Sequence, residues 1–268
     1  MSQRLVPDEL WSPVAPLLPP FASRPQGGGT APVDERAVFT AVVYVLTSGC
    51  AWRHLPETFG VSPATAHRRF SAWTKDGLWR RLHQVVLDEL GARGEVDWTS
   101  AIVDAASVRA KKGGSLTGRN PVDRGKRGSK LHVLSDAQGL PLTLGVPGAN
   151  VHDSQALLPL VLGIPAIRSR RGPRRRRPGR LRADKAYHSA ERLKWLRERG
   201  IVPRISRPGI ESSERLGRHR WKIERSISWL FGYRRLTVRY ERKGSHFLAF
   251  LGLAAALTCY KKLAKLTT

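Results

Sequence analysis

The chain has 268 residues, of which 41% are hydrophobic, so it is large and apolar enough to bury a core and fold as a globular protein. It carries 47 Lys and Arg against 21 Asp and Glu, a formal net charge of +26. Such an excess opposes compaction unless a polyanion neutralises it, and a DNA duplex presents a phosphate charge about every 1.7 Å of its axis. The composition therefore predicts a nucleic-acid partner.

Membrane insertion and export are not supported by any segment. The longest apolar stretch, Phe247–Tyr260, is shorter than the ~20 residues that cross a bilayer. The N-terminal segment MSQRLVPDELW lacks the continuous apolar region of an export signal. Cys50 and Cys259 lie far apart in apolar helical patterns, which predicts two buried free thiols in a reducing cytoplasm, with a disulfide as the alternative. We therefore expect a cytoplasmic protein without membrane contacts.

Residues 1–95 are predicted to form a small all-helical domain. The apolar residues of its first strong helix repeat at helical spacing behind a typical N-cap: Val38, Val42, Val45 and Leu46, after Asp34. A turn at Gly49 and a short helical region over 52–59 follow. Ser62 and Pro63 then match the cap and first position of a further helix.

That further helix has one apolar and one polar face. Ala66, Phe70 and Trp73 fall on the apolar face, and four residues point outward: Thr65, His67, Arg68 and Arg69. Two helices joined by a short turn, with a basic outer face, are typical of a helix-turn-helix that enters the major groove. An ordinary helical bundle with a solvated basic face is the alternative, and the net charge favours the DNA-binding interpretation.

Residues 96–268 change character and predict a mixed α/β sheet flanked by helices. Short strand-like stretches occur at 101–104, 130–135, 140–146, 181–184 and 201–205. Helical stretches occur at 153–162, 190–198, 218–230 and 246–263. The second and third strands are separated by Asp-Ala-Gln-Gly139, which predicts a hairpin because glycine accepts positive φ.

Two basic loops interrupt this domain, at 109–130 and 168–182. In the second, 9 of 15 residues are arginine, interrupted by glycine and proline. No regular element forms in such a run without neutralisation. Charge alone leaves two alternatives open, a solvated disordered loop and a segment that contacts DNA.

Three acids lie in settings that are unusual for this chain. Asp104 and Asp184 each end a short apolar strand, and Glu224 lies beside the buried stripe of a predicted helix. A buried carboxylate is costly without a cation or hydrogen bonds, and ligands gather at strand ends in α/β sheets. Three carboxylates brought together would repel one another unless divalent cations lay among them, so the pattern predicts a two-Mg²⁺ site. The alternatives are structural: Asp104 as a cap or ion pair, and Glu224 paired with Arg220.

Longer stretches around these acids resemble the DDE transposases of bacterial insertion sequences, specifically the insertion sequence five family. The similar stretches run through roughly residues 98–265, in matching order and spacing: Ala101–Ala110, Gly128–Pro141, Gly148–Ser154, Ala183–Tyr187, Trp221–Leu230 and Arg234–Arg242. The helical N-terminal segment also looks like the DNA-binding region joined to such enzymes.

The resemblance implies an RNase H-like fold, two divalent metal ions (Mg²⁺, with Mn²⁺ as a substitute), and cut-and-join chemistry at the terminal inverted repeats of an element. It makes Asp104, Asp184 and Glu224 the catalytic and metal-binding acids. It further implies a double-stranded DNA partner, at the element ends and the target, and a bacterial nucleoid setting. A homodimer in the complex that joins two ends is a hypothesis.

The resemblance also assigns phosphate-contacting residues. Arg220 matches the arginine of the family's Tyr-x2-Arg-x3-Glu-x6-Lys signature, while the tyrosine falls on Gly217 and the lysine on Phe231. Arg234 or Arg235 is expected to replace that lysine at the DNA, and Lys130 is added as a further DNA contact. His152 and Asp153 are weaker candidates near the site. Two alternatives remain: a helix-turn-helix regulator without catalysis, and a transposase remnant that binds but does not cut.

Overall fold

The computed structural model describes residues 5–20, 33–206 and 213–266, and side chains are described from residue 221 onward in the last range. Its centre is a six-stranded mixed sheet in the order β2-β3-β1-β5-β6, with β4 also paired to β3. The strands are β1 (Ala101–Arg109), β2 (Gly118–Arg119), β3 (Arg127–Asp136), β4 (Pro141–Gly145), β5 (Arg180–Ala183) and β6 (Val202–Ile205). Strand β3 pairs antiparallel with β1, β2 and β4, whereas β5 pairs parallel with β1 and with β6. The predicted mixed α/β architecture is confirmed.

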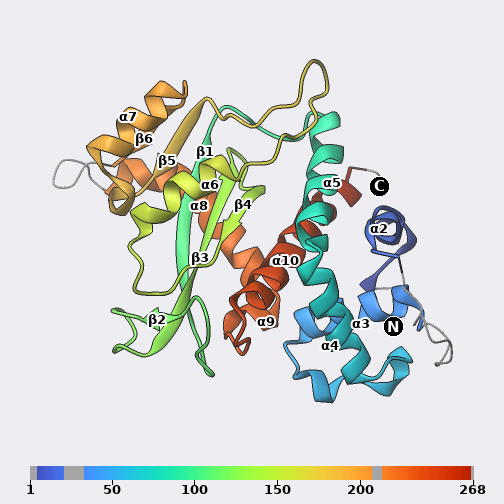
Figure 1. Cartoon of the computed structure of the whole chain (residues 1–268). Helices are drawn as coiled ribbons and strands as arrows, with labels where there is room; N and C mark the ends of the chain where they lie inside the picture. Colours follow the sequence, from blue (N-terminus) through green and yellow to red (C-terminus); the bar gives the residue numbers. More distant parts are fainter. Residues whose placement is uncertain (1–4, 21–32, 207–212, 267–268) are drawn as a thin grey trace.

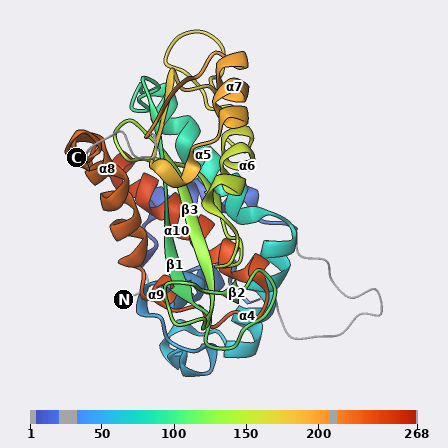
Figure 2. The ribbon, with the colours of Figure 1, turned by 90° about the vertical axis from the view of Figure 1, so that its left-hand side faces the viewer.

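Helices cover both faces of this sheet. Figure 2 shows α8 (Ser213–Phe231) on one side, and α6 (Leu157–Leu162) and α7 (Ala190–Glu198) on the other. The long C-terminal helix α10 (Gly244–Ala264) follows the short α9 (Arg234–Thr237) and contacts both β4 and α8. The chain thus places one charged helix, α8, directly against β1 and β3.

The N-terminal residues form the predicted helical region. The helices there are α2 (Asp8–Val14), α3 (Glu35–Ser48), α4 (Pro63–Lys75) and α5 (Leu78–Ala92). Asp34 caps α3 by accepting the N–H groups of Arg36 and Ala37, and Ser62 caps α4 through the N–H of Thr65. The short helix predicted over 52–59 consists instead of two single 3₁₀ turns, Trp52–His54 and Glu57–Phe59. Pro56, which has no N–H to donate, separates them.

The N-terminal helices share their core with the C-terminal helix α10, which runs along α5 (Figure 1). Phe70 of α4 stacks on Phe250 of α10 with ring centroids 4.4 Å apart, and Trp79 of α5 packs on Phe70 at 5.5 Å. Aromatic pairs of this kind stabilise beyond their buried area. The boundary near residue 95 that the sequence predicts is therefore crossed by one continuous core, and a separate N-terminal domain stays a prediction.

Helix α10 is long and apolar enough, by length and composition, to cross a membrane, and within the described residues it is the one such helix. Most of its apolar window is buried in the protein, which accounts for its composition as a core helix. Cys259 is buried within it and Cys50 is half-buried, and both are free thiols.

The β3–β4 hairpin turn fixes the position of α8. Gly139 has φ +88°, and a Cβ there would lie 2.7 Å from the carbonyl oxygen of Lys222 and from Ser226 Oγ. Lys222 Nζ donates to the carbonyl of Ala137 at 2.9 Å, and Arg225 donates to that of Gln138 at 2.7 Å. Glycine is thus required twice, for the turn and for the close approach of the helix.

His83 of α5 gives the fold a measurable pH dependence. Burial lowers its pKa from 6.5 to about 4, although its Nε2 lies 3.0 Å from the carbonyl oxygen of Pro141. Between about pH 6.5 and about pH 4, His83 is protonated in the unfolded state but neutral in the folded state. The free energy of unfolding should therefore fall as the pH drops through this range.

Replacing His83 with Gln should remove up to about 1.4 kcal/mol per pH unit of that dependence. Urea unfolding of wild type and H83Q across pH 4–7 measures the difference. The exposed His54 provides the control, since H54Q should keep the wild-type slope. Equal slopes in wild type and H83Q would show that His83 is not kept neutral by burial.

Candidate active site

Asp104 lies within β1, and Asp184 directly follows β5, its parallel neighbour. Ala101 pairs with Leu181 and Ile102 with Arg182, and this register, continued by two places, would bring Asp104 beside Asp184. Asp184 directly follows β5 and caps the 3₁₀ turn Lys185–Tyr187 through the N–H of Ala186 at 2.9 Å. Asp104 Oδ1 accepts the N–H of Ala105 at 2.8 Å. Each carboxylate is half-buried.

The pKa of Tyr187 is affected by both aspartates. Burial raises the pKa of its phenol, and the negative charges of Asp153, Asp104 and Asp184 raise it further. Three carboxylates therefore lie close enough to act on one buried hydroxyl, in a chain that carries only 21 acids among 268 residues. This concentration of negative charge is the reverse of the chain's overall balance.

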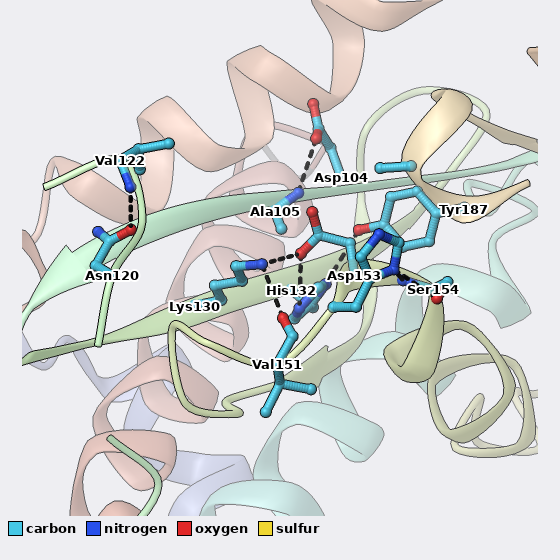
Figure 3. Close-up of polar contacts among 12 residues, drawn as sticks. Asp104, Ala105, Asn120, Val122, Lys130, His132, Val151, Asp153, Ser154 and Tyr187 are labelled. Atoms are coloured by element: carbon cyan, nitrogen blue, oxygen red, sulfur yellow. Dashed lines mark hydrogen bonds and ion pairs between the residues drawn. The ribbon is translucent and has the colours of Figure 1, made fainter. Parts of the chain in front are cut away.

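A buried histidine holds Tyr187 in place (Figure 3). His132 Nδ1 lies 3.0 Å from the Tyr187 hydroxyl, and its Nε2 lies 3.7 Å from Asp153 Oδ1. Burial lowers the pKa of His132 to about 4, against the opposing effect of Asp153, so the ring is neutral near pH 7. With its own proton on Nε2, the His132 ring accepts a hydrogen bond at Nδ1 from the Tyr187 hydroxyl. The turn that carries Asp184 is thereby tied to β3.

Lys130 closes this network. Its Nζ lies 2.8 Å from Asp153 Oδ1 and donates to the carbonyl of Val151 at 2.8 Å. The side chain is mostly buried, so the ammonium that the sequence assigned to DNA is engaged inside the protein. Asp153 serves this ion pair, and the cap of the turn Asp153–Ala156 is the side chain of His152, which accepts the N–H of Ser154.

Glu224 comes from α8 on the face of the sheet that Asp104 faces. Asp104 is opposite Val133 and Ala105 is opposite His132, so Asp104 and His132 point to opposite faces. His132 faces the Tyr187 side, and Asp104 therefore faces α8. Glu224 is exposed on that helix, between the buried Ile223 and Ser226. Ile227, expected in the buried stripe, is only half-buried.

The donor set suits a hard divalent cation, since carboxylate oxygens are the ligands that Mg²⁺ prefers. Asp104 lies on β1, Asp184 directly follows the neighbouring β5, and Glu224 lies on α8, which packs against β1. Within the described ranges, however, no three His, Cys, Asp or Glu side chains form a group that could hold a metal ion. A metal site shared by the three acids therefore remains a prediction.

The residues predicted on the DNA-facing side of α4 differ in exposure. His67 and Arg68 are exposed, whereas Thr65 is half-buried against its cap Ser62. Arg69 forms an ion pair with Glu35 at 3.3 Å. Burial, then the charges of Lys243 and Arg235, lower the pKa of His67.

Arg234 and Arg235 have opposite environments. Arg234 is exposed, but Arg235 is buried, with its Nε 2.7 Å from Glu241 Oε1 and a further bond to the carbonyl of Cys50 at 2.7 Å. The guanidinium of Arg235 joins α9 to the turn after α3 and is not presented to a ligand. Phe231, at the signature's lysine position, packs half-buried against the core. Gly217 and the side chain of Arg220 lie outside the described side chains.

Sequence reasoning missed His132, Tyr187 and Arg239 as site or support residues. Arg239 is fully buried and donates to the carbonyls of Ser115 and Leu116, so it pins the start of the first basic loop. Tyr187 lies three residues after Asp184, and this spacing within a matching stretch was the available signal. His132 and Arg239 look like ordinary strand and loop residues in the sequence.

A mixed sheet flanked by helices, in a chain of charge +26, suits a protein that acts on nucleic acid. Comparison with known proteins identifies the family. Residues 99–259 match the model "Transposase DDE domain", and residues 6–83 match "Putative transposase of IS4/5 family". The chain belongs to the DDE transposases of insertion sequences, and the predicted family is confirmed.

Curated relatives agree. The chain is 44% identical over 147 residues to the "Putative transposase for insertion sequence element IS402" of Burkholderia cepacia, covering 55% of this chain and 70% of the relative. It is 39% identical over 123 residues to the "Insertion element IS402 uncharacterized 16.2 kDa protein" of the same organism, covering 45% and 84%. The protein is thus a DNA-cleaving and strand-transferring enzyme, of a family that depends on divalent metal.

Among solved structures, the crystal structure of a pre-cleavage Mos1 transpososome is similar at a TM-score of 0.34 and 11% identity, over 88% of this chain and 81% of that one. This similarity is too distant to assign any residue or partner to the present chain.

Replacing Tyr187 with Phe should loosen the turn that carries Asp184. The change leaves His132 Nδ1 buried without its partner, at a cost of about 1–3 kcal/mol. We expect the divalent-ion concentration for half-maximal strand cleavage to rise about tenfold, the range seen when outer partners of a metal site are lost. Metal titration of cleavage measures it.

The buried Tyr233 supplies the matched control, because Y233F removes the same hydroxyl away from the carboxylates. Y233F should keep the wild-type metal dependence. If Y187F and Y233F shift it equally, the Tyr187–His132 contact has no part in the site.

Proposed function

We propose that Asp104, Asp184 and Glu224 together hold two Mg²⁺ ions and cut DNA at the terminal inverted repeats of an insertion sequence. The observation that supports this is the parallel pairing of β1 with β5, whose register, continued by two places, would bring Asp104 beside Asp184. Glu224 completes the set from α8, whose position is fixed by three hydrogen bonds to the hairpin turn.

When bound, the metal pair would activate the attacking water or 3′-hydroxyl and stabilise the departing oxygen of the phosphodiester. The chain's own residues orient that site. Asp104 is held by the rigid central strand β1, and Asp184 by the turn that Tyr187 ties to His132. Mn²⁺ would substitute, since it accepts the same oxygen ligands.

The DNA-contacting residues of this proposal are the exposed ones. His67 and Arg68 of α4, with the half-buried Thr65, would face the duplex, and Arg69 would do so from its pair with Glu35. Arg234 would contact a phosphate near the site, and Arg220 would do the same from the first half of α8. Arg235 and Lys130, both engaged inside the protein, would act by holding their segments in place.

The joining of two element ends bears on the oligomeric state of the protein and on its place in the cell. Joining two element ends needs two active sites, or one used twice, which favours a homodimer on paired ends in the bacterial nucleoid. Light scattering of the complex with paired ends tests this, and a single copy per complex would contradict it.

Loss of any one acid should abolish cutting without loss of binding. In D104N, D184N and E224Q the Mg²⁺-dependent cut product should fall by more than about 100-fold, beyond the cost of losing an outer partner of a metal site. DNA affinity should stay equal or rise, because each change removes a negative charge facing the polyanion. Cleavage of a labelled element end, with gel-shift affinity on the same preparations, measures both.

The exposed Glu191 of α7 provides the control, and E191Q should cut at the wild-type rate. Cutting by any of the three site variants at that rate would refute the assignment of that acid. If the wild-type chain itself did not cut DNA, it would be an inactive remnant. The replacement of the signature's tyrosine by Gly217 and of its lysine by Phe231 would then explain the loss of activity.

Arginine variants should separate DNA contact from structural support. R68A should weaken binding to the element end without changing thermal stability, since the side chain is exposed. R235A should lower stability by about 3–5 kcal/mol, because it leaves Glu241 buried and unpaired. Thermal unfolding and binding titrations distinguish them, and a stable R235A protein with a pure binding defect would reverse the interpretation of Arg235.

A further inference from the structure

The second arginine-rich loop is an ordered, anchored segment. We call residues 168–177 the arginine strap; it leads from α6 towards β5 and reaches the end of α5 (Figure 1). Its backbone pairs with itself, since Ile167 and Arg175 exchange two N–H···O bonds of 2.8 Å. Ser169 Oγ donates to the carbonyl of Pro173 at 2.9 Å, which closes the tip.

One carboxylate on α5 anchors the strap. Asp88 receives Arg174 Nη1 at 2.9 Å on both oxygens, and the same nitrogen donates to the carbonyl of Ala166 at 2.7 Å. Asp88 Oδ1 also accepts the backbone N–H of Arg168 at 2.8 Å. The Asp88 side chain is only 16% exposed, so these bonds are partly shielded from water and salt.

Glycine at position 91 lets the strap lie directly on α5. A Cβ at Gly91 would come within 2.1 Å of the carbonyl oxygen of Arg168 and 2.6 Å of Ile167 Cγ2. Glycine inside a helix costs roughly 0.5–1 kcal/mol relative to alanine. Its presence here is explained by the close approach of the strap, which a larger residue would push away.

Most of the strap's positive charge is not neutralised by an acid. Its seven arginines are exposed, and in the part of the chain that is described Arg174 alone forms a salt bridge. Arg175 lies over the ring of Trp98 at 5.5 Å, and Arg177 donates to the carbonyl of Arg199 at 3.3 Å, so neither of these contacts neutralises charge. Four consecutive arginines, Arg174–Arg177, join Arg199 in lining a hollow of about 580 Å³. Holding these side chains together in one exposed loop is unfavourable without a polyanion.

We propose that the arginine strap is a preformed clamp for the phosphate backbone of double-stranded DNA, set in position by Asp88. The inference rests on the proposed function, in that DNA is the substrate. Guanidinium groups bind phosphate oxygens through paired N–H donors, and a loop fixed before binding loses less entropy on contact. The strap precedes β5 whereas Asp184 follows it, so the clamped phosphates lie away from the reacting bond.

A pair of neighbouring acid variants tests the anchor. D88A and E89A each remove one negative charge from adjacent positions of α5, but among the described residues the ion-pair partner of Glu89 is Arg93 on its own helix. Charge alone predicts equal or tighter DNA binding for both. The clamp predicts that D88A binds several-fold more weakly than E89A, and that its log K against log[salt] slope is smaller by about 1–2.

Arginine substitutions test the contacts themselves. The triple variant R171Q/R176Q/R177Q should bind more weakly at low salt, with a salt slope reduced by about 2–3. Cleavage at saturating DNA should keep the wild-type rate, because the strap is remote from the acids. Thermal unfolding checks that each protein is folded. If D88A does not fold, G91A supplies the second displacement of the strap, and it should reproduce the weaker binding.

Binding and salt slopes like those of wild type in both D88A and the triple variant would overturn the clamp. That outcome is separable from failure of the proposed function, in which the wild-type chain would not cut DNA at all. Weaker binding with an unchanged salt slope would also overturn it, since lost phosphate contacts must lower the slope.

Discussion

The pairing of two short parallel strands determines where the chemistry of this chain is concentrated. β1 is held on its other edge by nine residue pairs with β3, so it is the rigid member, and β5 adopts its register. That register, continued by two places, would set Asp104 beside Asp184 in a protein of charge +26. Two like charges so placed are unfavourable alone. In the proposed site, divalent cations and the surrounding excess of Lys and Arg would offset that repulsion, and both would also attract DNA.

The support for this pair comes from groups that are themselves buried and neutral. His132, on β3, has a pKa lowered by burial, and the pKa of Tyr187 is raised, so neither adds charge to the site near pH 7. The hydrogen bond between them holds the turn after β5 in a fixed position relative to β3. On the opposite face, hydrogen bonds from α8 to the β3–β4 turn place Glu224. The groups on both faces of the sheet are thus held in place by contacts with β3 or with the turn that follows it.

Local patterns in the sequence were sufficient for the caps and the hairpin. The first strand was predicted to end at Asp104, but β1 continues to Arg109 because all nine of its residues pair with β3. Asp34, Ser62 and Gly139 act as predicted because capping and positive φ depend on neighbouring residues alone. The burial of Arg235 and the anchoring of the arginine strap were not predictable. They depend on Glu241 and Asp88, and the partner of the strap is 86 positions from Arg174 along the chain. The same charge-rich sequence thus contains arginines that hold the fold and arginines free for DNA.

The central claim is that Asp104, Asp184 and Glu224 share one pair of divalent ions. Anomalous scattering from a Mn²⁺-soaked crystal of the chain bound to an element end tests it directly. The account predicts two manganese peaks between the carboxylates of Asp104 and Asp184, with Glu224 ligating one of them. Manganese peaks at other places would contradict it. So would peaks at the two aspartates that Glu224 does not ligate.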